Sequence, residues 1–224
     1  MPTDYYPTIL IPAYQPNENL VKLIKALRQA RAKQRIIVVD DGSDADKQII
    51  FSKIQHLNVE LLQHTKNKGK GQALKTGFQY WLATSHPRDL GLVTADADGQ
   101  HLPQDILHLC DAFMQKPSDL YLGKRTFNKV PIPWRSRIGN KLTKYILRLF
   151  SKTDLEDTQT GLRAIPRKLL PALLSSNATG YEFELEMILI AEENQVLIQE
   201  IPIKTVYIDH NNSSHFNPLI DSIK

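Results

Sequence analysis

The sequence predicts an α/β protein whose central sheet is mostly parallel and flanked by helices. In the first 125 of its 224 residues, short apolar runs of strand length alternate with amphipathic helical patterns. The apolar runs are continuous, as in strands that are buried on both faces of a sheet. Polar residues collect where these runs end, which is where ligands bind in open parallel sheets. We therefore expect a ligand site at the carboxyl ends of the strands.

Each expected strand is a run of four to six residues, most of them apolar. Ile36-Ile37-Val38-Val39 is typical, since it is rich in β-branched residues and too short for a helix. The expected strands in this part are 8–13, 35–40, 59–63, 90–95 and 120–123.

The segments between these strands carry the helical repeat. Leu20, Leu23, Ile24 and Leu27 share one face of the first helix, and Pro103 suits the first turn of the last. The expected helices are 17–33, 44–54, 70–84 and 103–115.

The alternation breaks after Arg125. Without an internal repeat or linker, we expect one domain spanning residues 1–224, whose second half departs from the pattern of the first. The elements expected in the second half are a basic helix at 134–152, a polar loop at 154–161, a short strand, helices at 167–174 and 182–194, and one or two strands in 196–208 interrupted by Pro202.

The composition is that of an ordinary soluble globular protein, with 42% hydrophobic and 23% charged residues and a net charge of +4. The single cysteine, Cys110, cannot form an internal disulfide and lies in an apolar pattern, which fits a core position and a reducing compartment. Residues 1–6 lack the features of a signal peptide, and no apolar run approaches the length of a membrane span. We expect a cytoplasmic protein.

Two carboxylates follow the fourth expected strand. Asp96 and Asp98 stand directly after the apolar run 90–95, and Gly99 permits a turn that lets them converge. Carboxylate oxygens suit Mg²⁺ or Mn²⁺, which complete their coordination with water and substrate phosphates. The pair therefore predicts a metal site for a diphosphate-containing substrate. The alternative is an Asp-rich β-turn with no ligand.

Two further motifs stand at strand or helix ends. Asp40-Asp41-Gly42-Ser43 offers carboxylates to ribose hydroxyls or a base N–H, although it could serve only to cap the next helix. Asn67-Lys68-Gly69-Lys70-Gly71 has the glycines and lysines of a phosphate-holding loop before a helix N-terminus, or else it is a solvated lysine-rich turn.

In order and spacing these motifs resemble those of family 2 glycosyltransferases with the GT-A fold. The branch that the chain resembles most is the dolichyl-phosphate mannosyltransferase and polyprenyl-phosphate glycosyltransferase group. The motifs that carry the resemblance are Ile9-Leu10-Ile11-Pro12-Ala13-Tyr14, Val38–Ser43, Asn67–Gly71, Asp96–His101, Gly123-Lys124-Arg125, Asp157-Thr158-Gln159-Thr160-Gly161 and Tyr181–Glu186.

The resemblance implies a nucleotide-sugar-binding half (1–125), an acceptor-binding half (126–224) and a role for particular residues. The nucleotide-sugar would be held by Pro12, Ala13, Tyr14, Glu18, Asp41, Lys70 and Asp96. Asp96 and Asp98 would bind the metal, with Gln100 as a further ligand. Arg125 would receive the phosphate of the acceptor, and Asp98, Arg125 and Asp157 would form the catalytic set. One departure is His215, which stands in a Ser-Ser-His-Phe segment where members of the family often carry a Ser-Lys pair.

The nature of the acceptor decides whether a base is needed. A phosphate nucleophile is already anionic, so positioning carries much of the rate. A sugar hydroxyl must lose its proton to a carboxylate, for which Asp157 and Glu186 are the candidates.

The segment from Lys124 to Lys152 holds nine Lys or Arg residues and no acid. Its basic positions recur at helical spacing beside an apolar stripe, as in a helix lying on an anionic membrane surface; a core-packed helix with a solvated basic face is the alternative. Nucleic acid is not an expected partner, because no nucleic-acid module is present and the carboxylates of Asp96 and Asp98 would repel it. A nuclease would need such carboxylates, so it stays open as a weak alternative.

The sequence thus predicts a metal-dependent inverting glycosyltransferase that moves a sugar from a nucleotide-sugar, of the UDP-glucose or GDP-mannose type, to a polyprenyl phosphate at the cytoplasmic membrane face. A membrane-protein partner is a further expectation. The alternatives are the same fold acting on a saccharide hydroxyl, and a noncatalytic nucleotide-binding module that docks on membranes.

Overall fold

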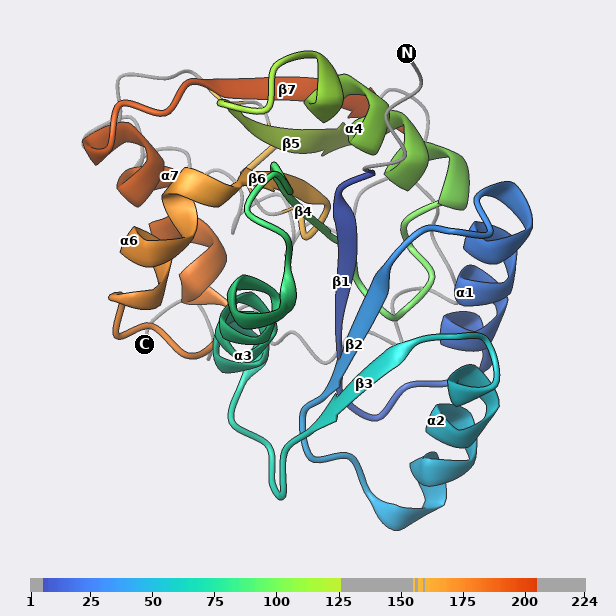
Figure 1. Cartoon of the computed structure of the whole chain (residues 1–224). Coiled ribbons are helices and arrows are strands. Elements are labelled where there is room, and N and C mark those ends of the chain that lie inside the picture. Colours follow the sequence, from blue (N-terminus) through green and yellow to red (C-terminus); the bar gives the residue numbers. More distant parts are fainter. Residues whose placement is uncertain (1–5, 126–154, 156, 159, 205–224) are drawn as a thin grey trace, which may run out of the picture.

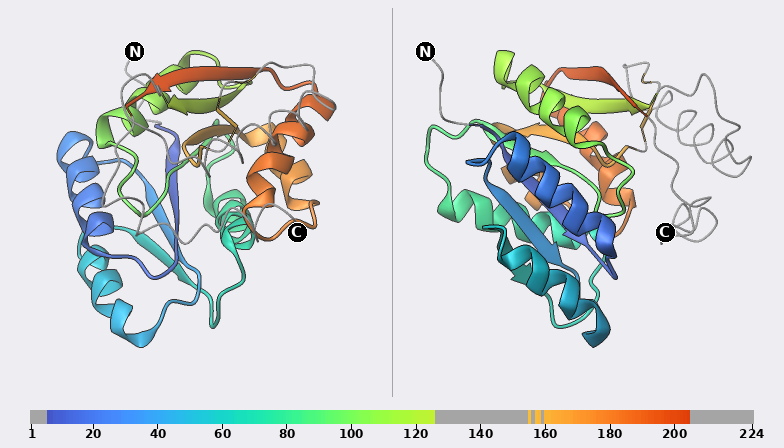
Figure 2. Two further views of the ribbon diagram at one scale, coloured as in Figure 1. Left: turned by 180° about the vertical axis from the view of Figure 1, so that it is seen from behind. Right: turned by 90° about the vertical axis from the view of Figure 1, so that its right-hand side faces the viewer.

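The computed structural model describes residues 6–125, 155, 157–158 and 160–204 (Figures 1 and 2). The strands are β1 (Thr8–Ala13), β2 (Ile36–Asp40), β3 (Glu60–Gln63), β4 (Gly91–Thr94), β5 (Leu120–Arg125), β6 (Arg163–Pro166) and β7 (Ile198–Ile203). The α-helices are α1 (Glu18–Ala30), α2 (Gln48–Gln55), α3 (Lys70–Thr84), α4 (Pro103–Gln115), α6 (Leu170–Leu174) and α7 (Glu182–Glu193). Short 3₁₀ turns precede α2 (Ala45–Lys47) and α6 (Arg167–Leu169).

Among the described residues, the strands form a single sheet in the order β3-β2-β1-β4-β6-β5-β7. The pairs β1–β2, β1–β4, β2–β3 and β5–β7 are parallel. Only β6 runs against its two neighbours, β4 and β5. The mostly parallel α/β sheet expected from the sequence is therefore confirmed, and six of its strands present their carboxyl ends at the same edge.

Helices cover both faces of the sheet (Figure 1). Alternate residues of β1 point to opposite sides: Ile9 and Ile11 pack with α1, α2 and α4, whereas Leu10 packs with α3, α6 and α7. Both sets are fully buried. This two-sided burial explains why the sequence shows continuous apolar runs.

Most element predictions agree with the structure, and the differences have local causes. The helix expected at 44–54 begins as a 3₁₀ turn before α2. Only one strand, β7, is formed by the described part of 196–208, and it contains Pro202. Among the described strands β7 pairs only with β5 and is therefore an edge strand. Proline, which has no N–H, is tolerated on the unpaired side of such a strand. The expected basic helix at 134–152 lies outside the described residues.

Within the part of the chain that the structure describes, no helix is both long enough and apolar enough to span a bilayer.

Candidate active site

The strand-end motifs meet at the carboxyl edge of the sheet. The Asp41 N–H donates to Ala13 O at 2.8 Å, and the Ala95 N–H donates to Leu10 O at 3.1 Å, which fixes the exits of β1, β2 and β4 relative to one another. The Asn19 side chain on α1 donates to Asp98 O at 2.9 Å. The acid-bearing loop after β4 is thereby attached to the start of α1.

The loop from Asp96 to His101 turns sharply on itself. Gly99 has a φ of 87°, and the N–H of Gln100 donates to Asp98 Oδ1 at 2.9 Å. The Asp96 N–H donates to His101 Nδ1 at 3.1 Å, so that nitrogen is an acceptor, and burial lowers the pKa of the His101 ring. Burial and the neighbouring Asp96 charge raise the pKa of Asp98 to about 6. The two acids have converged closely enough to repel.

A buried lysine joins the acids. Lys70 Nζ lies 2.7 Å from Asp96 Oδ1 and 3.0 Å from Glu184 Oε2. Burial on its own would lower the pKa of Lys70, but the two carboxylates outweigh it and the pKa is raised. Burial likewise opposes ionisation of Asp96, but Lys70 and His101 outweigh it and lower the pKa of Asp96. Lys70 therefore stays cationic and Asp96 stays anionic.

The backbone of the loop before α3 is occupied by protein acceptors. Asp41 accepts from the N–H groups of Lys68 and Gly69, both at 2.9 Å. The first donors of α3 are taken by the chain before α7: Gly71 N–H bonds Gly180 O at 3.1 Å and Gln72 N–H bonds Thr179 O at 2.9 Å. These four donors are not free to cradle a phosphate, and Lys70 is not a solvated turn residue. What the loop contributes is the Lys70 side chain.

Close packing at the α3–α7 contact brings Lys70 and Glu184 together. A Cβ on Gly71 would lie 2.6 Å from Phe183 Cβ and 2.8 Å from Gly180 O, so only glycine allows this approach. The Glu184 carbonyl accepts from the fully buried guanidinium of Arg163, which fixes the start of α7 from the sheet side.

The two aspartates after β2 are buried and hydrogen-bonded. Asp41 is 3% exposed and also contacts His64 Nδ1 at 2.6 Å. Asp40 accepts from the Ser43 N–H at 2.9 Å within the loop, and the helical turns that follow have no side-chain capping bond. The helix cap that the motif could have supplied is therefore not formed. In this state Asp41 positions the loop that carries Lys70, and its expected contact with the nucleotide remains a prediction.

The other residues expected at the nucleotide lie around the end of β1. Pro12 and Ala13 are buried in the strand, and Tyr14 is 38% exposed at its exit. Glu18 is at the first position of α1, and its side chain pairs with Lys53 on the surface.

Arg125 and Asp157 form a bidentate ion pair. The Arg125 Nε and Nη2 atoms lie 2.6 and 2.9 Å from the two carboxylate oxygens, and the Arg125 N–H donates to Oδ2 at 3.2 Å. Asp157 is fully buried, and its own N–H donates to Glu200 Oε1 at 3.0 Å. Asp157 therefore holds the guanidinium in place.

Two residues at this site, Glu184 and Gly161, stand in motifs that carry the family resemblance, but the sequence analysis assigned neither of them a role. A Cβ on Gly161 would lie 2.3 Å from Asp96 Oδ2, so the loop that begins with Asp157 lies directly against the acid pair. A Gly preceded by a Thr-Gln-Thr loop is a visible signal, but its partner cannot be identified without the fold. Of the other sequence candidates, Glu186 accepts from Ser176 Oγ at 2.6 Å, and His215 lies outside the described residues.

We expect Gly161→Ala to lower activity without unfolding the protein. The three atoms nearest to the new methyl group would all belong to the Asp96 carboxylate, which can move aside. A displaced Asp96 would no longer hold its ligands, and a shift of about 1 Å can cost roughly 10²-fold in rate. Thermal unfolding and sugar transfer should be measured in parallel. Unchanged transfer would contradict the placement of Gly161 against Asp96.

The acid pair fits a divalent metal. Among the described residues no cluster of three His, Cys, Asp or Glu side chains is arranged for a metal, but Mg²⁺ commonly uses one or two carboxylates and takes the rest of its ligands from water and phosphate. Asp96 already binds the Lys70 ammonium, and repulsion from Asp96 disfavours the charge on Asp98. A divalent ion bound by Asp96 and Asp98 would relieve that repulsion, with Gln100 nearby in the same loop.

The raised pKa of Asp98 predicts a pH-dependent gain from Asp98→Asn in metal-free protein. The carboxyl binds its proton more tightly when folded (pKa about 6) than when unfolded (about 3.8), so its contribution to stability is full below pH 4 and is lost as the pH rises through 6. The asparagine variant avoids that loss and should be more stable than the wild type by about 3 kcal/mol at pH 7.5, and by roughly half of that at pH 5. Thermal unfolding at both pH values checks this, and Mn²⁺ should reverse the order at pH 7.5.

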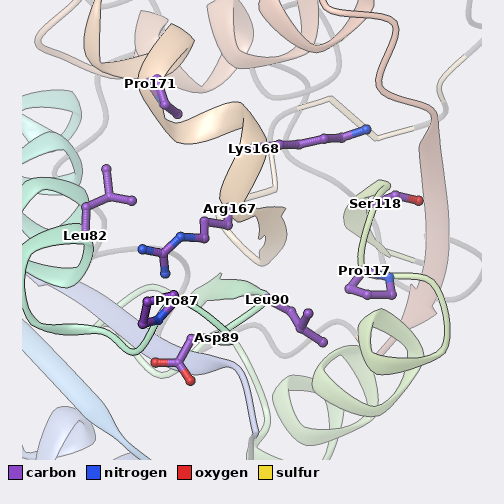
Figure 3. A pocket seen from close by; sticks show the side chains of 9 residues that line it. All are labelled: Leu82, Pro87, Asp89, Leu90, Pro117, Ser118, Arg167, Lys168 and Pro171. Atoms are coloured by element: carbon purple, nitrogen blue, oxygen red, sulfur yellow. The ribbon is translucent and has the colours of Figure 1, made fainter.

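A shallow hollow of about 600 Å³ lies at the opposite edge of the sheet (Figure 3). It is lined by the segments that enter β4 and β5 and leave β6, including Leu90, Pro117 and Arg167. Since Asp96 follows the other end of β4, this hollow is not part of the acid site.

Three comparisons place the chain among known proteins. The model of "Glycosyl transferase family 2" matches residues 8–174. A UDP-N-acetylglucosamine–dolichyl-phosphate N-acetylglucosaminyltransferase from Methanococcus voltae is 30% identical over 95% of this chain and 90% of its own length. A polyprenol monophosphomannose synthase from Mycolicibacterium smegmatis is 28% identical, with coverages of 87% and 75%. The structure of glucosyl-3-phosphoglycerate synthase from Mycobacterium tuberculosis, solved with Mn²⁺ and UDP, has a TM-score of 0.70 at 16% identity and covers 93% of this chain and 75% of that one.

Proposed function

The chain belongs to glycosyl transferase family 2 and is a glycosyltransferase with the GT-A fold, and we propose that it transfers a sugar from a nucleotide-sugar to a polyprenyl phosphate. Relatives named for dolichyl-phosphate or polyprenol acceptors match over most of the chain, which supports a lipid-phosphate acceptor. The alternative of a noncatalytic module is set aside, because family membership makes the chain an enzyme.

The observation that carries this proposal is the position of Gly161, which links two groups of charged residues. Asp96 and Lys70 form an ion pair where the nucleotide diphosphate is expected. Arg125 and Asp157 form a second ion pair where the acceptor phosphate is expected. Gly161, four residues after Asp157, lies against the Asp96 carboxylate, so the proposed donor and acceptor sites would adjoin. Residues 1–125 would thus supply most of the donor site, and residues 126–224 much of the acceptor site.

Each group then has a task in the reaction. Asp96 and Asp98 would hold Mg²⁺ or Mn²⁺, which supplies Lewis-acid stabilisation of the departing nucleoside diphosphate. A Mn²⁺ complex of a structural neighbour supports such a metal. Arg125 would orient the acceptor phosphate by paired hydrogen bonds. The phosphate oxygen attacks the sugar carbon opposite the leaving group, so inversion is expected, and no base is needed because the nucleophile is already anionic.

The cell location also belongs to this proposal. A polyprenyl phosphate resides in a membrane, so the enzyme would work at the membrane's cytoplasmic face, bound peripherally through the basic stretch 134–152. Vesicles with anionic lipids should then bind the protein better than neutral vesicles, and high salt should release it.

Incubation with labelled donors tests the transfer directly. Each reaction contains the protein, MnCl₂ or MgCl₂, and undecaprenyl phosphate. Labelled UDP-glucose, UDP-N-acetylglucosamine or GDP-mannose is added to separate reactions. We expect labelled, lipid-extractable product with one donor, and none when undecaprenol replaces its phosphate ester. If nucleoside diphosphates bind but no donor gives lipid product, the acceptor proposal is wrong.

A further inference from the structure

We propose that Lys70 is a mobile counter-ion with two carboxylate partners, which neutralises Asp96 until a divalent metal binds and then remains paired with Glu184 alone. This inference rests on the metal site of the proposed function. It assigns a positioning role to Glu184, a residue to which that function gives no task.

The geometry places Lys70 where it must compete with a metal. Its Nζ lies 2.7 Å from Asp96 Oδ1, so the ammonium occupies one oxygen of an expected metal ligand. A divalent ion bound by Asp96 would repel the ammonium at that distance. Lys70 and the metal therefore cannot both use Asp96 as Lys70 uses it in this structure.

Lys70 cannot simply withdraw into solvent. Its side chain is 15% exposed, and its stem starts at the first position of α3 beneath the α7 contact. An ammonium left buried without a partner carries a large desolvation cost. If a metal displaced Lys70 from Asp96, this cost would therefore oppose metal binding, unless a second carboxylate remained next to the ammonium.

Glu184 meets that requirement. Its Oε2 atom lies 3.0 Å from Lys70 Nζ, and its side chain is 9% exposed. The Arg163 guanidinium donates a hydrogen bond to the Glu184 carbonyl, and Gly71 allows α7 to pack closely against α3. The Glu184 carboxylate is therefore fixed in place. The lysine stem is flexible, so its ammonium can move the short distance from one partner to the other. Released from Asp96, the ammonium remains next to the expected diphosphate position.

The experiment measures binding of Mn²⁺ alone to nucleotide-free full-length protein, by the electron paramagnetic resonance signal of free Mn²⁺. Lys70→Met removes the competing cation and should tighten Mn²⁺ binding by about tenfold. Glu184→Gln removes the retaining partner and should weaken it by roughly fivefold. In the double variant no ammonium remains to be retained, so Mn²⁺ should bind as tightly as it does to Lys70→Met.

Controls and the double variant keep this test decisive. Lys68→Met and Glu193→Gln change exposed residues of the same loop and helix and should leave Mn²⁺ affinity unchanged. If Lys70→Met does not fold because Glu184 is left unpaired, the double variant lacks both charges and must still bind Mn²⁺ more tightly than the wild type.

Two results overturn the inference. The first is that both Lys70→Met and the double variant bind Mn²⁺ no more tightly than the wild type. The other is a Glu184→Gln effect that persists in the double variant, which a merely structural role would produce. If neither the wild type nor any variant binds Mn²⁺, even with UDP or GDP present, the proposed metal site is wrong as well. If they bind Mn²⁺ but their affinities do not rank as expected, this inference alone is overturned.

Discussion

Asp96→Asn is expected to lower kcat/KM for sugar transfer by roughly 10³-fold, a loss of about 4 kcal/mol of transition-state stabilisation. Asp96 lies 2.7 Å from the Lys70 ammonium and is an expected ligand of the metal. Its replacement therefore weakens the binding of both cations that would face the leaving diphosphate. Asparagine has nearly the same shape, and Lys70 keeps Glu184 as a partner. The fold should therefore survive while the activity is lost.

Steady-state transfer with saturating Mn²⁺ measures this effect, and thermal unfolding shows whether the variant is folded. Asp46→Asn is the matched control, because that carboxylate is 67% exposed and pairs only with its neighbour Lys47 among the ion pairs of the described residues. Transfer by Asp96→Asn within threefold of the wild type would mean that the acid pair does not hold the metal.

The fold was largely predictable from the sequence because its signals are local. Short continuous apolar runs such as residues 36–39 are typical of strands buried on both faces, and the structure confirms β1, β2 and β4 at or near their expected bounds. The position of β6 was not predictable. Four residues, Arg163–Pro166, carry no sign of strand direction, and their place between β4 and β5 depends on pairing across the sheet.

The site was predictable where function depends on strand ends, and unpredictable where it depends on contacts between distant segments. Asp96 and Asp98 follow a strand, so their type and position are visible in the sequence. The meeting of Lys70 with Glu184 spans 114 positions and depends on Gly71 allowing α7 to approach α3. The Asn67–Gly71 loop illustrates the limit: its composition favours a phosphate cradle, yet Asp41 and the 179–180 carbonyls already accept from its backbone donors.

Asp157→Asn is expected to decide between the two acceptor classes. In the proposed function Asp157 acts only by holding Arg125, so its replacement should lower transfer to the lipid phosphate by roughly 10²-fold, mainly through a higher KM for the acceptor. Loss of a buried ion-pair partner should also cost roughly 2 kcal/mol of stability, since Arg125 is a quarter exposed and keeps some hydration. A base for a sugar hydroxyl would instead lower kcat by several orders of magnitude and remove the acidic limb of its pH profile.

A double-mutant cycle separates the two roles of Asp157 more sharply than the single variant does. If Asp157 serves Arg125, then Arg125→Gln with Asp157→Asn should be no slower than Arg125→Gln alone, because the guanidinium that Asp157 positions is already gone. If Asp157 removes a proton from the acceptor, the two losses should multiply. The contacts favour the first result: both carboxylate oxygens bind Arg125, and Asp157 is fully buried behind it. Arg125 is therefore the member of the pair that can reach a substrate.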